Sequence, residues 1–237
     1  MFAAKQIYLG RSAKAAPTAK SYVQNGLIAM WDGIENAGWG THDESAATWK
    51  DLGGNGYDLT VTAPNAWETN GIRAVGKIVA KTSNMIPSNL TVYGEICVDA
   101  SRGNGTGAYF WNDTSSGIAG SQKFLCQDVG ASVPFICIGY KVQNFSPVLN
   151  VNGTFQVNWG NRACCYNGSA IFDTTGAYNP ASYSGEMLIG GRSKYNGSYG
   201  FFCSNALFRS IRIYSRALTS AEIAANYAID KERFNLP

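Results

Sequence analysis

The sequence has little charge. Only 15% of its 237 residues are charged and the formal net charge is +3, whereas soluble domains average about 25% charged residues. The basic residues are spread along the chain, so the clustered basic surface that nucleic-acid binding requires is missing. No apolar run approaches the ~20 residues that cross a bilayer. We therefore expect neither a nucleic-acid partner nor insertion into a membrane.

Residues for nucleophilic or metal chemistry are also scarce. His42 is the only histidine, so a Ser/His/Asp arrangement would depend on it alone, and no nucleophile-elbow sequence is present. The six cysteines form no C-x-x-C pair, and the adjacent Cys164 and Cys165 would point to opposite faces of a strand. Most of the cysteines lie in apolar strand patterns, which favours buried, reduced thiols. A zinc site is not expected.

Residues 1–25 differ in composition from the rest of the chain. The first residues lack the uninterrupted apolar segment of a secretory signal, so no signal peptide is expected. Residues 10–21 are small and polar and offer no face to bury. A disordered leader is one interpretation. We expect instead an arm that docks on a partner or a neighbouring subunit, followed by one domain over residues 26–237.

Short strand patterns dominate the chain from residue 26 onward. Asn-Gly pairs, which favour tight hairpin turns, separate many of them. Strands joined by turns rather than helices form antiparallel sheets. The predicted strands are 27–31, 57–62, 72–80, 90–100, 108–111, 123–128, 134–142, 154–159, 162–166, 187–189 and 201–214.

The stretch 206–223 predicts a strand followed directly by a helix. Phe208, Ile211 and Ile213 define one apolar face, with a bulge expected at Arg209-Ser210. The polar residues that interrupt or follow this apolar face, including Arg209, Arg212 and Arg216, are expected to be solvated. Thr219 and Glu222 form a capping box, with Leu218 and Ile223 as its hydrophobic staple. The helix should continue to about Lys231.

Four motifs resemble the laminin-G-like branch of the concanavalin A-like lectin/glucanase superfamily. The closing I-R-I-Y-S-R-A-L-T-S-A-E-I lies at 211–223, and G-L-I-A-M-W-D-G at 26–33 resembles the opening strand. T-W-K-D-L-G-G-N-G at 48–56 resembles the family's W-x-D-L-S-G-N-G turn, with Gly53 in place of Ser, and M-L-I-G-G-R at 187–192 resembles its I-G-G strand. The resemblance implies an all-β, antiparallel jelly-roll β-sandwich with one short C-terminal helix. It does not imply one function, because the fold hosts lectins, adhesive modules and hydrolases.

The loop 32–44 is the first candidate site. It contains His42 and the candidate ligand-binding residue Trp39, which in the alternative interpretation packs the loop over the edge of the sandwich. Asp32, Glu35 and Asp43 with backbone carbonyls are oxygen ligands of the kind that calcium takes. The regular Asp-x-Asp-x-Asp spacing is missing, so we expect no metal, with calcium as the minor alternative.

A second candidate site combines aromatic and polar groups on Gly-rich flanks. A glycan site needs an aromatic platform for the C–H face of the sugar and fixed hydrogen-bonding groups for its hydroxyls. Trp111, Asn112 and Asp113 supply these groups, and Tyr195 lies in a further tip at 195–199. The alternative is that Trp111 belongs to the core and 112–117 is an ordinary hairpin.

The carboxylate pair that retaining glycosidases need is incomplete. Such enzymes place two carboxyl groups about 5 Å apart, and the resemblance implies a strand of the form E-x-D-x-x-E. Glu95-Ile96-Cys97-Val98-Asp99 has Cys at the middle position and lacks the last Glu. No catalytic residue is therefore assigned.

These observations favour a non-enzymatic binding or structural module. The opening K-Q-I-Y-L-G at 5–10 resembles the starts of some phage tail and decoration proteins. We therefore expect a bacteriophage virion surface protein without a signal peptide, a homo-oligomer anchored to other virion proteins through residues 1–25 and able to bind glycans. The alternatives are a bacterial surface or secreted carbohydrate-binding module and a divergent glycan hydrolase or lyase.

Overall fold

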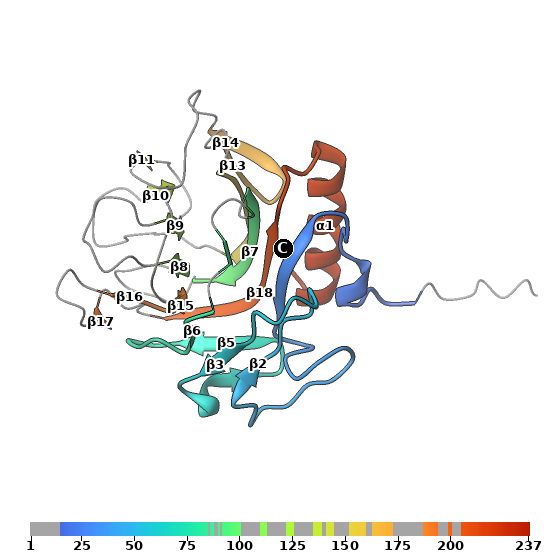
Figure 1. Cartoon of the computed structure of the whole chain (residues 1–237). Coiled ribbons are helices and arrows are strands. Elements are labelled where there is room, and N and C mark those ends of the chain that lie inside the picture. The colour runs from blue at the N-terminus through green and yellow to red at the C-terminus, as the bar shows by residue number, and fades with distance from the viewer. Residues whose placement is uncertain are drawn as a thin grey trace, which may run out of the picture.

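A computed structural model shows two antiparallel β-sheets packed as a sandwich, with one helix near the C-terminus (Figure 1). This confirms the predicted fold class. The structure describes residues 15–84, 86, 87, 90, 92–100, 110–112, 122–125, 135–138, 141–144, 152–159, 163–172, 187–193, 199–200 and 205–237.

The larger sheet has eight strands in the order β14-β13-β12-β7-β18-β5-β4, with β1 paired to β18. These strands are β1 Leu27–Asp32, β4 Trp67–Glu68, β5 Gly71–Ala74, β7 Tyr93–Asp99, β12 Asn152–Asn158, β13 Ala163–Tyr166, β14 Ser169–Phe172 and β18 Ala206–Tyr214. The second sheet has six strands in the order β2-β3-β6-β15-β8-β9. They are β2 Thr48–Trp49, β3 Leu59–Val61, β6 Ala80–Thr82, β8 Phe110–Asn112, β9 Gln122–Leu125 and β15 Met187–Ile189.

Two separate hairpins and three helical segments complete the described structure. The hairpins pair β10 Phe135–Ile138 with β11 Lys141–Asn144, and β16 Arg192–Ser193 with β17 Tyr199–Gly200. The helical segments are the 3-10 turns η1 Ala19–Ser21 and η2 Pro64–Ala66 and the helix α1 Ser220–Phe234. No helix among the described residues is long and apolar enough to cross a membrane.

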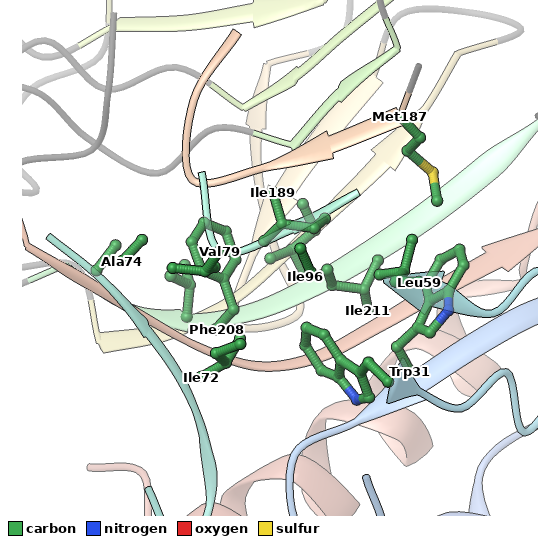
Figure 2. Close-up of a cluster of buried hydrophobic side chains, with 14 of the residues drawn as sticks. Trp31, Leu59, Ile72, Ala74, Val79, Ile96, Met187, Ile189, Phe208 and Ile211 are labelled. Atoms are coloured by element: carbon green, nitrogen blue, oxygen red, sulfur yellow. The ribbon is translucent and has the colours of Figure 1, made fainter. Parts of the chain in front are cut away.

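The main core fills the space between the two sheets. Trp31 and Ile211 from the larger sheet and Leu59 and Ile189 from the smaller one are fully buried in a single cluster (Figure 2). Each large apolar side chain buried in this way contributes about 1.5–3 kcal/mol to folding. The alternation of apolar residues in the strands therefore determines which face of each sheet turns inward.

β18 lies at the centre of the larger sheet, and both of its faces are buried. It pairs with β7, β5 and β1, and its register with β7 shifts between Phe208 and Ser210. The predicted bulge is thus confirmed. The prediction that Arg209 and Arg212 are solvated is wrong, because Arg209 is 6% exposed and Arg212 is 0% exposed. Arg212 is covered by α1, which packs on the outer face of this sheet (Figure 1), whereas Arg209 contacts Asn152 of β12 and Asp99 of β7.

α1 begins and ends at well-formed caps. The Thr219 side chain accepts from the backbone N–H of Glu222, whose carboxylate accepts in return from the N–H of Thr219. Leu218 and Ile223 share one apolar cluster, as the predicted hydrophobic staple requires. The helix ends at Phe234, and the next residue, Asn235, caps it in the left-handed conformation with φ 50°. It therefore continues one turn beyond the predicted end at Lys231.

The Asn-Gly signal marks a tight turn at Asn167-Gly168, whereas Asn152 and Gly153 lie within β12 and Asn55 and Gly56 lie in the longer connection between β2 and β3. Asn167 and Gly168 have φ of 51° and 77° and join β13 to β14. Two positive φ values in succession are the requirement of a type I′ turn. β14 was not predicted, and the predicted strand 72–80 is interrupted at Gly76, whose φ is +62°.

Candidate functional site

The structure places the candidate residues in different parts of the molecule. Trp39 lies in the loop after β1, while Trp111 and Asn112 lie in β8 of the other sheet, opposite Leu188 and Met187 of β15. Asp113 and Tyr195 lie outside the described residues. Trp39 is therefore the candidate whose side-chain surroundings the structure defines.

Trp39 is only partly covered by the protein. Its side chain is one of the few large apolar groups left exposed among the described residues, at 40%. The Lys20 ammonium lies 5.1 Å from the centre of the ring, within the range of a cation–π contact. Part of the indole is therefore in contact with solvent.

Buried carboxylates, rather than Trp39, hold the loop in place. Asp32 Oδ1 accepts from the backbone N–H groups of Ile34 and Glu35, both at 3.0 Å. Glu35 accepts from the N–H of Gly40 at 2.9 Å and from that of Ala19 at 2.7 Å. Gly33 is required at the loop entry because a Cβ there would lie 2.4 Å from the Cα of Gly71.

A cation from α1 neutralises the loop carboxylates. Arg233 donates to both Asp32 oxygens at 2.8 and 2.9 Å and to Glu35 at 3.1 Å. Desolvation by burial nevertheless raises the pKa of Asp32 to about 6, although Arg233 acts in the opposite direction. In the calcium interpretation these two carboxylates would face a metal, but the guanidinium group occupies that position. No cluster of three metal-ligating side chains occurs in the part of the chain that the structure describes.

A groove of about 460 Å³ lies between this loop, the end of α1 and the segment before η1. We call it the His42 groove. Its lining residues are Ala16, Pro17, Thr18, Ile34, Glu35, Gly40, His42, Glu232 and Arg233. Trp39 directly precedes the lining residue Gly40. The Trp39 side chain is not part of this lining, which combines apolar residues with polar and charged ones, as small-ligand sites do.

His42 lines the groove, but its ring nitrogens face the protein. Its Nδ1 lies 3.0 Å from the carbonyl oxygen of Gly33, so in the neutral ring this nitrogen carries the proton and Nε2 keeps a lone pair. Nε2 is buried and has no hydrogen-bond partner among the described residues. The closest carboxylate is that of Glu44, at 4.0 Å.

A second polar cluster lies buried between β7, β18 and α1. Arg212 donates to Glu95 at 2.7 Å and to both oxygens of Asp230 at 2.8 and 2.6 Å. Asn226 donates to Glu95 at 2.8 Å, and Thr154 donates to Asp230 at 2.8 Å. We call this set the Arg212 network. Its two carboxylates and its guanidinium group are 0% exposed.

The Arg212 network includes one of the two carboxylates considered for catalysis. Glu95 is buried under α1, and burial raises the pKa of its carboxyl group above the usual value, against the pull of Arg212. Asp99 is 8% exposed and lies 3.6 Å from Arg209. Cys97, between them, is a buried free thiol, as is Cys164. Sequence reasoning missed the network because its members come from distant parts of the chain.

No protein-family model matches the sequence, and no curated protein matches it either. Among solved structures, the chain is similar to Trypanosoma rangeli sialidase in complex with 2,3-difluorosialic acid, with a TM-score of 0.57 and 16% identity over 94% of this chain and 34% of that chain. A GH54 α-L-arabinofuranosidase mutant matches with a TM-score of 0.52 and 11% identity, covering 79% of this chain and 50% of that chain. A tryptophan-to-alanine mutant of HCR/D matches with a TM-score of 0.52 and 15% identity, covering 87% of this chain and 51% of that chain.

The chain therefore spans between a third and about half of the length of these proteins. At such low identity the similarity concerns the fold alone. Together with the observed two-sheet sandwich, it is compatible with a concanavalin A-like fold.

Proposed function

We propose that this chain is a non-enzymatic, glycan-binding module of the laminin-G-like type, displayed on the surface of a bacteriophage virion. The observation that carries the binding part is the exposed indole of Trp39, on the same loop as Gly40 and His42 of the His42 groove. A sugar ring can stack its C–H face on such an indole while its hydroxyls reach fixed polar groups. Glu35, Glu232 and Arg233 supply such polar groups in the lining of the His42 groove.

The buried position of Glu95 supports the non-enzymatic part. A glycosidase carboxyl group must reach the scissile bond, and the two groups must lie on opposite sides of it. Glu95 is fully buried, bound by Arg212 and Asn226 beneath a helix. A divergent hydrolase or lyase remains the enzymatic alternative, since similar solved structures include a sialidase and an arabinofuranosidase.

In this proposal the N-terminal arm within residues 1–25 attaches the module to other virion proteins, and repeated copies on a symmetric particle make a homo-oligomer. The resemblance of residues 5–10 to the starts of phage tail and decoration proteins supports it. Copurification with phage particles tests this part. A gene located among polysaccharide-utilisation genes would instead favour a bacterial carbohydrate-binding module.

A glycan array with matched variants tests the binding site. The Trp39→Ala variant should lose at least about tenfold in affinity for any glycan that the wild type binds, which corresponds to about 1.4 kcal/mol. Trp39→Phe should retain part of the binding because a smaller aromatic face remains. Val75→Ala is the control, since Val75 is the other large exposed apolar residue among those described, at 53%.

Two outcomes would contradict the proposal. If Trp39→Ala binds a glycan as tightly as the wild type, the ligand lies elsewhere. If the wild-type protein releases sugars from a glycan and both Glu95→Ala and Asp99→Ala abolish release while the variants stay folded by circular dichroism, the module is an enzyme.

A further inference from the structure

The segment just before β1 is part of the folded body. Ala19 is 0% exposed and Tyr22 is 2% exposed. Figure 1 shows this segment, drawn in blue, beside α1. Both residues share an apolar cluster with Met30 and Leu52. We call residues 18–24 the N-terminal clasp.

Tyr22 connects the N-terminal clasp to the Arg212 network. Its hydroxyl donates to Asp230 Oδ1 at 2.7 Å. The guanidinium carbon of Arg212 lies 4.0 Å from the centre of its ring, and that of Arg233 lies 5.5 Å away. The ring thus covers Arg212 and forms cation–π contacts with both arginines. A hydrogen bond to a buried carboxylate contributes more to stability than one between neutral groups.

Backbone groups of the clasp are held by three different elements. The N–H of Ala19 donates to Glu35 in the loop after β1 at 2.7 Å. The N–H of Val23 donates to Asn226 of α1 at 2.9 Å. The carbonyl of Val23 accepts from the Tyr214 hydroxyl of β18 at 3.1 Å. Two of these contacts, those with Asn226 and Tyr214, connect the clasp to residues about 200 positions away in sequence.

We propose that residues 18–24 are an intramolecular clasp that closes the Arg212 network and forms a rigid base for the arm that precedes it. The cooperative folding unit then begins at Thr18 and not at Gly26. Force applied through residues 1–14 reaches the sandwich through Tyr22 and its partners, without a flexible hinge at 18–24. The clasp also fixes one wall of the His42 groove, since Thr18 lines that groove. This proposal does not depend on the identity of any ligand.

Hydrogen–deuterium exchange on the full chain gives the first test. The amides of Ala19 and Val23 should exchange only on global unfolding, as those of β18 do, whereas that of the exposed turn residue Gly54 should exchange rapidly. Exchange of Ala19 and Val23 as fast as that of Gly54 would overturn the proposal.

Trypsin provides a second test, because Lys20 lies within the clasp. Cleavage after Lys20 should be negligible in the native protein and should become rapid in Tyr22→Ala. Tyr22→Ala should also lower Tm by at least about 5 °C, and Tyr22→Phe by less. Lys20→Ala, an exposed change in the same segment that removes only the cation–π contact with Trp39, is the control for Tm and should lower it by less than Tyr22→Ala does.

If Tyr22→Ala does not fold, the milder Tyr22→Phe variant still tests the proposal, since it should speed amide exchange at Val23. The proposal would be overturned by cleavage of the wild type after Lys20 at the rate of an unfolded chain, or by an unchanged Tm in Tyr22→Ala. Either result would show that residues 18–24 are a flexible linker.

Discussion

Removal of the Arg212 cation should destabilise the protein far more than removal of an exposed arginine near the end of the same strand. In Arg212→Met the Glu95 and Asp230 carboxylates would remain buried without the guanidinium group that now lies 2.6–2.8 Å from them. Methionine keeps much of the length of the side chain, so the change removes mainly the charge and its hydrogen bonds.

The expected loss is large because a buried carboxylate without its partner keeps its full desolvation penalty. Breaking a buried ion pair from one side costs about 3–5 kcal/mol. For a chain of this length each kcal/mol lowers Tm by about 2–4 °C, so Arg212→Met should lower Tm by about 6–20 °C. Differential scanning calorimetry with wild type and variant in the same buffer measures this shift.

Arg216→Met is the matched control. Arg216 pairs with Glu222 at 2.6 Å, but both side chains are about 30% exposed, and such pairs contribute little. Its Tm should fall by no more than about 3 °C. Equal decreases in Tm for the two variants would refute the claim that the Arg212 network is shielded from solvent and energetically costly to break.

The pH dependence gives an independent check on the same reasoning. Burial already raises the pKa of Glu95, and Arg212 opposes that rise. Without Arg212 the pKa of Glu95 should rise further, so the native variant takes up a proton on mild acidification before the unfolded chain does. The deficit of Arg212→Met should therefore be largest at neutral pH and smaller at pH 5. A deficit that grows on acidification would contradict this account.

Three further predictions concern the loop and the helix. Thr219→Ala should cost about 1 kcal/mol by removing the N-cap acceptor of α1, seen as a Tm about 2–4 °C lower, whereas Thr219→Ser should be nearly neutral. Gly33→Ala should cost about 1–3 kcal/mol in urea unfolding, because the added methyl meets the backbone of Gly71. Burial raises the pKa of Asp32 from 3.8 to about 6, so between pH 4 and 6 the native state binds a proton that the unfolded chain has lost. The contribution of Asp32 to the free energy of unfolding should therefore fall as the pH rises from 4 to 6. Asp32→Asn should remove that slope, and an unchanged slope would show that another group carries it.

The strand and helix at 206–223 could be predicted because their signals are local. The alternation of apolar residues, the bulge at Arg209-Ser210 and the capping box each involve neighbours within four residues. The Asn167-Gly168 turn is local for the same reason, since two positive φ values are a property of the residues themselves. The strand that follows it, β14, was missed because Ser169–Phe172 has no clear alternation.

The candidate site was only partly predictable. The exposure of Trp39 depends on which other side chains fill the base of its loop. Asp32, Glu35 and Arg233 fill it and hold it by hydrogen bonds and ion pairs. Arg233 lies 201 residues from Asp32 in sequence, and no local pattern connects them. The same carboxylates that resemble calcium ligands in the sequence therefore bind an arginine in the structure.

The environment of Arg212 shows why a polar strand position cannot be assigned to solvent from the strand alone. Alternation in β18 indicates two faces, but it does not say whether the second face meets water. α1 supplies Asp230 eighteen residues later, β7 supplies Glu95 from 117 residues earlier, and the clasp supplies the Tyr22 ring. Each of these partners stabilises the Arg212 guanidinium group only when the others are in place. If one were removed, a buried charge would remain unpaired and its desolvation cost would no longer be offset. The sandwich, the C-terminal helix and the N-terminal clasp should therefore unfold in one cooperative step, although the clasp lies nearly 200 residues from the helix in the sequence.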